Sequence, residues 1–580
     1  MLVRPDWLNL NGAWEFETDP GDLGLKEHWF ANRRLHDQII VPFTLEAAAS
    51  GLAPSPEAPN IVWYARDFEL PASWQAARVV LRIGACDHWT RIFLNGQEAG
   101  QHRGGYSPIS VDLTHLLVPG TNRLVIRVED PLSWTQPRGK QAGTTRWPID
   151  YDAVTGIWQT AWLEPLGPVS VEEISSQFRL ADNTLTVTAG FSRQFDGDLE
   201  IRVLRDGLEL ACGSTSTDYR AEARVSLQLE MPALWSPSSP TLHQLELTLT
   251  SRSRDHQDRV VSYVGLREIT VNSGKLCLNG EPLYLRGVLD QGYFPEGWYT
   301  AVDDHAIRRD VELTLALGFN CARKHQKAED PRYLYWADRL GLMVWAEMPS
   351  GRIFSTELIS TLTTEWTRLM RRDRNHPSII AWVPFNESWG VWHQIERPAQ
   401  RAFVDAIYAL SKTLDTTRPV IGNDGWEYSS GDLWTLHIYN GSEADSLNDR
   451  LNRVLANPGA PLNKSESPVH QRVGALPGAT VTGLPVLLTE CGGVGFIGNR
   501  ERTGDEFAYG ALPTTTTRLE SDCRAIAREI DAARALGGYV WTQLTDVQQE
   551  INGVLYFDRT PKLPIDTFRE IFSGIGSFPD

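Results

Sequence analysis

The sequence predicts a protein of several domains: an N-terminal β-sandwich of the jelly-roll kind, an immunoglobulin-like β-sandwich and a C-terminal (β/α)8 TIM barrel. Short alternating strands with turn signals between them continue to about residue 270. From about residue 271, apolar strands alternate with helical patterns, which is typical of repeated βα units. A chain of 580 residues is also too long for one hydrophobic core. We therefore expect domains at residues 1–166, 167–270 and 271–580.

The first region reads as an all-β unit. Alternating segments such as Arg78–Ile83 and Asn122–Val128 predict strands, and Asn95-Gly96 predicts a hairpin turn. The segment Pro131–Ile157 has no period and is rich in Gly, Thr, Arg and Trp. Long ordered loops in compact domains are often functional, so we expect this loop to contribute to function.

The second region alternates in the same way. Leu185–Ala189, Leu199–Val203 and Leu245–Leu249 predict strands with one buried face. Its size suits an immunoglobulin-like sandwich. No candidate chemical group stands out in it, so we interpret it as a spacer and packing domain.

The third region predicts the barrel. Its expected strands are Leu283–Leu289, Phe319–Arg323, Leu342–Glu347, Ile379–Asn386, Pro419–Asn423, Trp434–Tyr439, Val486–Glu490 and Gly538–Gln543. The expected helices between them are Asp304–Leu317, Pro331–Leu340, Glu357–Arg371, Pro398–Thr413, Arg518–Leu536 and Ile565–Ile571. Eight strands with intervening helices are typical of a TIM barrel. The Pro- and Gly-rich section Glu443–Gly483 predicts an excursion at its rim.

Composition narrows the class of partner. The formal net charge of −18 argues against a nucleic-acid or anionic-membrane partner. No apolar segment is long enough to span a bilayer, and the N-terminus lacks the layout of a signal peptide. The six cysteines are scattered without a CxxC motif, which predicts buried thiols in a reducing, cytoplasmic setting. The 21 tryptophans suit a carbohydrate-binding cleft, because pyranose faces stack on indole rings.

Two glutamates stand where apolar strands end. The run Ile379–Phe385 leads into Asn386-Glu387, and Val486–Leu488 leads into Glu490 and a pair of glycines. Catalytic groups of TIM barrels lie at the carboxyl ends of strands. Two carboxylates facing each other there predict glycoside hydrolysis, with one as acid and the other as nucleophile or base.

Polar and aromatic residues at the other strand ends are candidates for substrate binding. They are Asp290, Arg323, Lys324, Glu347, Asn386, Trp426, His437, Tyr439, Trp541 and Gln543. We expect Tyr439 and Arg323 to keep Glu490 ionised, since hydrogen bonds and positive charge favour a carboxylate. Trp382, Phe385 and Trp389 are expected to give Glu387 an apolar setting that raises its pKa. Structural roles, such as capping or a solvated ion pair, are the alternative for each residue taken singly.

These motifs resemble glycoside hydrolase family 2, which contains β-galactosidases, β-glucuronidases and β-mannosidases. The resemblance extends over nearly the whole chain, from Leu10–Trp14 through Tyr263–Glu268 and Gly318–Arg323 to the strand-end glutamates. It implies a retaining exo-β-glycosidase, with Glu490 as nucleophile and Glu387 as acid/base. It also implies that Asn386 contacts the sugar 2-hydroxyl and that Tyr439 hydrogen-bonds the nucleophile.

The departures from the family pattern bear on the substrate. Asp290-Gln291 stands where many members have a histidine, and no Asn-x-Lys motif of the glucuronidases is found. The basic run at Arg323–Lys327 is a candidate for pairing with a uronate carboxylate through Lys324 or Lys327, or else a solvated, salt-bridged loop. A β-galactoside is therefore the first expectation, with galacturonide, glucuronide and arabinoside as alternatives. A sugar-binding protein without activity is the rival from another class.

No cofactor and no metal are expected. Some family members hold magnesium with a histidine and two glutamates, but Glu347 lacks a histidine at the matching spacing. The expected partner is a terminal β-linked sugar of an oligosaccharide or glycoconjugate. The sequence leaves the oligomeric state open.

Overall fold

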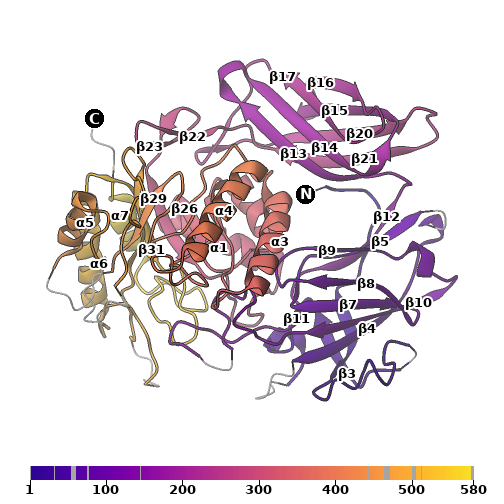
Figure 1. Ribbon diagram of the computed structural model, residues 1–580, viewed down its shortest axis with the longest axis horizontal. Coiled ribbons are helices and arrows are strands. Elements are labelled where there is room, and N and C mark those ends of the chain that lie inside the picture. Colours follow the sequence, from indigo (N-terminus) through magenta and orange to yellow (C-terminus); the bar gives the residue numbers. More distant parts are fainter. Residues whose placement is uncertain are drawn as a thin grey trace.

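The computed structural model describes residues 2–31, 33–53, 60–74, 77–143, 146–439, 445–462, 471–498, 504–510 and 512–576. Figure 1 shows a first β-sandwich in indigo and a second in magenta, with a barrel coloured pink to yellow beside them. The predicted fold class is confirmed.

The first sandwich packs two main sheets against each other. One contains β1 (Leu8–Asn9), β12 (Ala161–Leu166), β5 (Arg78–Ile83) and β9 (Ile109–Asp112), in that order. The other contains β3 (Asp37–Val41), β2 (Gly12–Thr18), β4 (Ile61–Glu69), β10 (Thr121–Glu129), β7 (Trp89–Leu94) and β8 (Gln97–Arg103). A short pair, β11 (Gly156–Ile157) with β6 (Cys86–Asp87), joins them. The core between the sheets includes Trp14, Leu81, Ile92 and Ile126.

The second sandwich follows from strict alternation. One sheet has β13 (Val171–Arg179), β14 (Thr184–Phe195) and β17 (Arg220–Gln228), and the other has β16 (Leu208–Ser216), β15 (Gly197–Arg205), β20 (His243–Ser251) and β21 (Gln257–Val264). Along β20 every second residue is buried, because successive side chains point to opposite faces. Small antiparallel pieces lead into the barrel: β18 (Trp235–Ser236), β19 (Ser239–Pro240), β22 (Ile269–Asn272), β23 (Lys275–Leu278) and β24 (Glu281–Pro282).

Seven parallel strands form the barrel wall. Their order is β28 (Ile379–Val383), β27 (Met343–Glu347), β26 (Cys321–Lys324), β25 (Leu285–Asp290), β31 (Leu536–Thr542), β30 (Val486–Gly492) and β29 (Trp434–His437). Their inward side chains, among them Cys321, Trp345, Ala381 and Leu487, form one buried cluster. All seven carboxyl ends therefore lie at one rim.

The remaining strand of the predicted eight, between β28 and β29, is irregular and makes no continuous hydrogen-bond ladder. The predicted strand Pro419–Asn423 makes one isolated parallel bridge to β28, at Trp382↔Val420, and a second bridge, Asn386↔Asp424, lies just beyond the ends of both. On its other side, Gly425 accepts a hydrogen bond from the His437 amide at 3.3 Å. This segment closes the barrel between β28 and β29, and it brings Asp424 to the same rim.

Helices surround the wall. They are α1 (Asp304–Ala316), α2 (Pro331–Leu340), α3 (Thr356–Asp373), α4 (Pro398–Leu414), α5 (Leu447–Ala456), α6 (Thr516–Ala532) and α7 (Ile565–Ser573). Helix α5 lies within the predicted excursion and was not expected. Ser446 and Asp449 form a capping box at its start, and Leu447, Leu451 and Val454 form its buried stripe. Residues 440–444 and 463–470 of that section lie outside the described residues.

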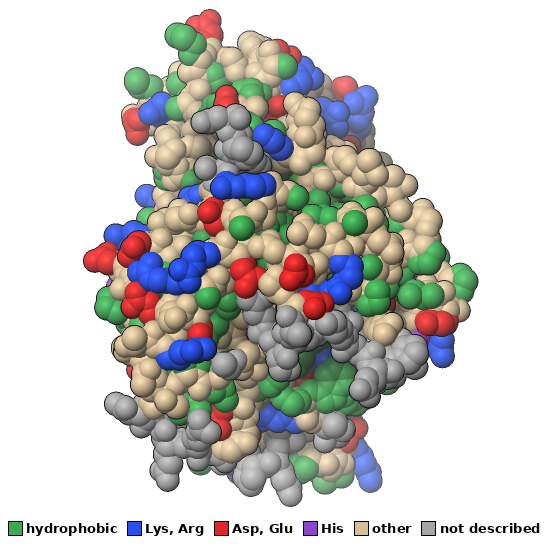
Figure 2. All heavy atoms as spheres, turned by 90° about the vertical axis from the view of Figure 1, so that its left-hand side faces the viewer, with side chains coloured by type: hydrophobic (Ala, Val, Ile, Leu, Met, Phe, Trp, Pro, Cys, Tyr) green, Lys and Arg blue, Asp and Glu red, His purple; other side chains and the backbone are tan. Residues whose placement is uncertain are grey.

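Within the described ranges, no helix has the length and apolar content needed to cross a membrane. On the face of the molecule in Figure 2, described acidic and basic side chains are interspersed.

Candidate active site

Glu387 stands on a tight turn directly after β28. Glu387 and Ser388 both have left-handed backbone, with φ of 51° and 57°, which non-glycine residues rarely adopt. The neighbouring segment fixes this turn: the Glu387 amide donates to the Asp424 carbonyl at 2.9 Å, and the Ser388 amide donates to Oδ1 of Asn423 at 2.9 Å. The Glu387 side chain is 16% exposed, so it reaches the open rim while its backbone is held rigidly.

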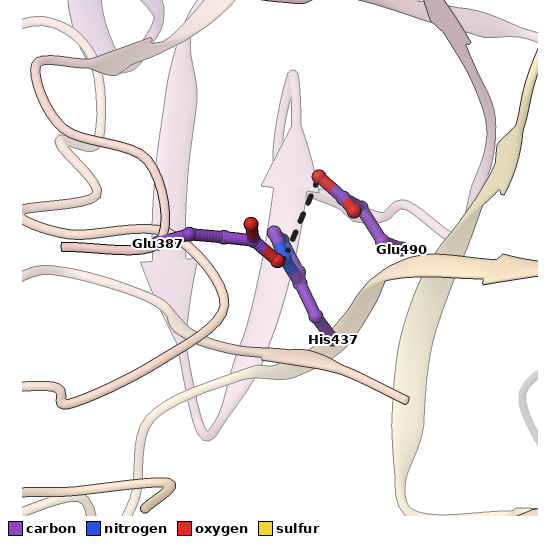
Figure 3. A group of neighbouring side chains, drawn as sticks. All are labelled: Glu387, His437 and Glu490. Carbon is purple, nitrogen blue, oxygen red and sulfur yellow. Dashed lines mark hydrogen bonds and ion pairs between the residues drawn. The ribbon is translucent and has the colours of Figure 1, made fainter. Parts of the chain in front are cut away.

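Glu490 lies within β30 and is almost fully buried. Its Oε2 accepts from the Tyr439 hydroxyl at 2.6 Å, and its Oε1 accepts from Nη1 of Arg323 at 3.0 Å. Ligand atoms of Glu387, His437 and Glu490 all lie within 4.8 Å of one another, and Figure 3 shows the three side chains converging. The sequence-predicted pair of carboxylates is therefore brought together.

His437 lies between these two carboxylates. Its Nδ1 is 2.8 Å from Oε1 of Glu387 and 3.4 Å from Oε1 of Glu490, and its Nε2 is 3.2 Å from Oδ2 of Asp424. Burial disfavours its charged form, but Glu490 and Asp424 outweigh burial and raise the pKa of His437 to about 10. His437 is thus an imidazolium at neutral pH. Both of its nitrogens face carboxylates, whereas the sequence suggested that it would contact the sugar.

Arg323 is the centre of the site's charge network. Its guanidinium is fully buried and pairs with Glu347 at 2.8 Å, Asp424 at 2.9 Å and Glu490 at 3.0 Å. Its Nη2 also donates to Oδ1 of Asn386 at 2.6 Å. The Nδ2 donor of Asn386 is buried and has no protein partner, so one hydrogen-bond donor beside Glu387 is left for a ligand.

The two glutamates have opposite pKa shifts. Burial and the charge of Glu490 raise the pKa of Glu387 above its ordinary value, and His437 opposes them. Burial alone would raise the pKa of Glu490 too, but His437 and Arg323 outweigh it, and its pKa is lowered. Glu387 therefore favours the protonated form and Glu490 the ionised form, as an acid and a nucleophile require.

Lys324 and Asp290 pair with each other. Lys324 Nζ lies 2.6 Å from Oδ2 of Asp290 and 2.7 Å from Oε2 of Glu329, and all three side chains are at least 95% buried. The other oxygen of Asp290 accepts from the Gly292 amide. Lys327 pairs with Glu329 at 3.0 Å. The salt bridges of the basic run are thus present, but the run is buried and not solvated as the sequence suggested.

The aromatic residues divide into two groups. Trp382 and Phe385 point to the helices rather than to Glu387: Trp382 donates to Asp415, and Phe385 packs on Phe403 of α4. Side chains alternate along a strand, so Trp382 faces outward between the inward Ala381 and Val383. Trp389, by contrast, lies at the rim beside the Arg352 guanidinium.

Trp541 takes the space that the glycines after Glu490 leave. A Cβ on Gly492, whose φ is +83°, would lie 2.6 Å from the Trp541 ring. Gly492 thus makes room for this indole, and Gly493 makes room for Tyr509 and Tyr439. Nearby, Gln543 accepts from Gln291 at 2.7 Å and keeps a buried Nε2 without a protein partner. Trp426 is half-buried, with its ring 6.5 Å from that of His437.

Three functional neighbours, Asp424, Tyr509 and Arg352, were not among the predicted site residues. Asp424 directly follows an expected strand, and that position could have predicted that it belongs to the site. Tyr509 stacks on Tyr439 with centroids 3.9 Å apart, but it comes from a distant loop with no pattern. Arg352 is buried between indole rings and follows β27 by five residues.

Glu387, His437 and Glu490 are also close enough together to hold a metal ion. The donor set fits a cation poorly, because Arg323 and Tyr439 already bind the two oxygens of Glu490 and Asp424 faces Nε2 of His437. An imidazolium supplies the positive charge at this place, so we derive no step through a metal.

Models of one family match three successive parts of the chain. The sugar-binding domain of glycosyl hydrolases family 2 matches residues 8–163, a further domain of glycosyl hydrolases family 2 matches residues 174–267, and the TIM barrel domain of that family matches residues 269–469.

Individual relatives agree with these matches. A β-glucuronidase of Paenibacillus borealis is 28% identical over 454 residues, which cover 71% of this chain and 72% of the relative. A β-galactosidase of Enterobacter cloacae is 27% identical over 452 residues, which cover 71% of this chain but only 42% of the relative.

A solved structure shares the fold. The β-glucuronidase of Ruminococcus gnavus superposes with a TM-score of 0.81 at 20% identity, and the match covers 99% of both chains. Three family models in sequence order, together with relatives that are glycoside hydrolases, establish the family. The chain belongs to glycosyl hydrolase family 2.

Proposed function

We propose that this protein is a retaining exo-β-glycosidase that releases a terminal sugar by double displacement. The observation that carries the proposal is the separation of the two carboxylates, whose facing oxygens lie within 4.8 Å. Retaining enzymes hold their carboxyl groups roughly 5–5.5 Å apart, and inverting enzymes about 6.5–9.5 Å. Facing oxygens no more than 4.8 Å apart support the retaining arrangement over the inverting one.

In the first step, Glu490 attacks the anomeric carbon and Glu387 donates its proton to the leaving oxygen. The bond to the aglycone breaks as the glycosyl–Glu490 ester forms. The hydrogen bonds from Tyr439 and Arg323 support this role of Glu490, because they hold it ionised and oriented. Burial supports the role of Glu387, since it keeps the proton on the acid.

In the second step, Glu387, now ionised, takes a proton from water, and the hydroxide formed attacks the anomeric carbon from the side that the aglycone has left. Glu490 departs as a carboxylate, and the sugar leaves with retained configuration. We assign Asn386 to the sugar 2-hydroxyl, since its Nδ2 is a buried donor without a protein partner.

The charges at the rim favour a neutral glycone of the β-galactoside type. In the part of the chain that the structure describes, each of five cations around the site has a carboxylate partner. They are Lys140 with Glu550, Arg323 with Glu490, Lys324 with Asp290, Lys327 with Glu329 and Arg352 with Asp150. A uronate carboxylate would have to compete with these internal partners.

A β-hexuronide is the second candidate. The similarity to the β-glucuronidase of Paenibacillus borealis favours it, because the match covers 72% of that protein. An arabinoside is the third candidate, and the substrate panel described next includes it.

A panel of p-nitrophenyl β-glycosides tests the proposal: galactoside, galacturonide, glucuronide, mannoside and arabinoside. We expect turnover of the galactoside above the others, and proton NMR of the first product should show the β-anomer. First release of the α-anomer would overturn retention. No turnover of any sugar would favour the sugar-binding protein.

Replacement of the nucleophile provides the matched test. Glu490→Gln should abolish turnover and keep the fold, whereas Glu520→Gln on the partly exposed face of α6 should change neither. An active Glu490→Gln variant would overturn the assignment.

A further inference from the structure

Four indole rings lie in one row at the rim of the barrel. Trp134 and Trp147 come from the long loop of the first sandwich, and Trp389 and Trp392 follow Glu387. The ring centroids are 5.9 Å apart for Trp134–Trp147, 6.4 Å for Trp147–Trp392 and 6.4 Å for Trp392–Trp389. We call these four residues the tryptophan array. Two separate parts of the chain thus build one aromatic surface.

Arg352 fixes the array. Its guanidinium lies 3.7 Å from the ring centroid of Trp389 and 4.6 Å from that of Trp147, and it pairs with Asp150 at 2.6 Å. Its carbonyl accepts from Nε1 of Trp392 at 2.8 Å, and its amide donates to the Trp134 carbonyl at 2.8 Å. A surface held in this way is formed before a ligand arrives, which lowers the entropy cost of binding.

The array is joined to the turn that carries the acid/base. Ser388 donates to Oε2 of Glu427 at 2.5 Å, and Oε1 of Glu427 pairs with Arg472 at 3.0 Å. Arg472 in turn donates to the Trp392 carbonyl at 3.2 Å. Trp389 is two residues from Glu387. These contacts place the array on the acid/base side of the site.

That side is where the leaving group must lie. An acid that protonates the glycosidic oxygen has to face it, so the aglycone extends past Glu387 and away from Glu490. Trp134, Trp147 and Trp392 are only half-buried, so part of the surface of each is exposed. Partly exposed indoles suit the apolar face of a pyranose, which stacks while its hydroxyls bind polar neighbours.

We propose that the tryptophan array is an aglycone site that binds a pyranose ring, so that an oligosaccharide is hydrolysed with a higher kcat/KM than a small aryl or alkyl glycoside of the same sugar. The proposal rests on the proposed function, since it assumes that Glu387 protonates the leaving oxygen. Beyond that function, the proposal identifies the leaving group as a sugar and names the residues that bind it.

Glycosyl fluorides separate this site from the chemistry. A fluoride carries no aglycone and leaves without an acid, so kcat/KM for its hydrolysis, which covers the steps up to the glycosyl–Glu490 ester, reports on glycone binding and on attack by Glu490. For the sugar that the panel selects, we would compare the β-fluoride with β-linked disaccharides in Trp147→Ala and Trp392→Ala. We expect kcat/KM for a disaccharide to fall roughly tenfold or more, as for the loss of a stacked ring. Hydrolysis of the fluoride should change less than about twofold.

Trp89→Ala is the matched control, because Trp89 is an exposed indole of β7 in the first sandwich. It should leave both substrates unchanged. Trp147→Leu, which keeps an apolar side chain, covers the case in which the alanine variant does not fold. Equal losses on fluoride and disaccharide, or no loss on either, would overturn the aglycone site. An unaltered enzyme that does not hydrolyse the fluoride would instead overturn the proposed function, and the aglycone site with it.

Discussion

Nδ1 of His437 lies 2.8 Å from Oε1 of Glu387, and the same nitrogen lies 3.4 Å from Oε1 of Glu490. One imidazolium therefore acts on both members of the carboxylate pair. The charged groups that face it are Glu387, Asp424, Glu490 and Arg323, and the titratable His325, whose pKa burial lowers, is also close. Because it lowers the pKa of both glutamates, it sets the pH range in which one is protonated and the other ionised.

His437→Gln removes this charge and should move the whole bell-shaped pH profile of kcat/KM to higher pH. Without His437 the pKa of Glu490 rises, so the acidic limb moves up; the pKa of Glu387 rises as well, so the basic limb moves up. An opposite charge at this range changes a pKa by roughly 1–3 units, which gives the size of the shift. The limbs belong to the coupled pair rather than to either residue.

The measurement is kcat/KM from about pH 3 to 10 on the best panel substrate. A variant with lower kcat and an unmoved profile would show that His437 only fills space.

Gly425 gives the imidazole its position. Its φ is +85°, and a Cβ there would lie 2.4 Å from three atoms of the His437 ring. Gly425→Ala should therefore displace the ring, lower kcat/KM and move the pH profile in the same direction as His437→Gln. Gly120→Ala is the control, since its φ is +83° with nothing within 4 Å. Both variants bear the same backbone strain of about 1 kcal/mol, but only the first should change the pH profile.

Arg323 neutralises three buried carboxylates at once. Arg323→Met should lower the free energy of unfolding by roughly 3–5 kcal/mol, because it leaves Glu347 buried without its cation and Asp424 with His437 alone. It should also move the acidic limb of kcat/KM upward, since the guanidinium lowers the pKa of Glu490. Urea unfolding and the pH profile measure the two effects.

Arg323→Lys is the informative companion. It keeps the charge, but an ammonium cannot reproduce the planar fork that reaches three carboxylates and Asn386. We expect it to recover part of the stability and less of the activity. Full activity in the methionine variant would contradict the role of Arg323 in holding Glu490 ionised.

The sequence predicted the two glutamates because each interrupts a buried apolar strand, and a barrel topology then requires them to meet at one rim. It could not predict that His437 lies between them. That contact depends on how the segment before Gly425 fits between β28 and β29, where only isolated bridges form. Pairing registers of this kind follow from the packed barrel and not from local pattern.

The sequence could not predict the partners of Lys324 for a related reason. Asp290 comes from the neighbouring strand and Glu329 from the loop after β26, and both reach Lys324 only in the folded barrel. The sequence of a basic run does not distinguish one that binds a ligand from one that pairs with buried carboxylates of the same protein. The tryptophan-rich segments were visible, yet their union in one row required the sandwich loop to dock on the barrel.

Lys324→Met distinguishes the two roles of this lysine. As an internal ion pair, its loss leaves Asp290 buried without a cation and Glu329 with Lys327 alone, so the free energy of unfolding should fall by roughly 3–5 kcal/mol. Lys26→Met, at an exposed lysine of the first sandwich, should change stability little. Thermal and urea unfolding measure this, alongside KM for the galactoside and the galacturonide. A variant with normal stability and a raised KM for the galacturonide alone would instead make Lys324 a contact of a uronate, and would favour the hexuronide as substrate.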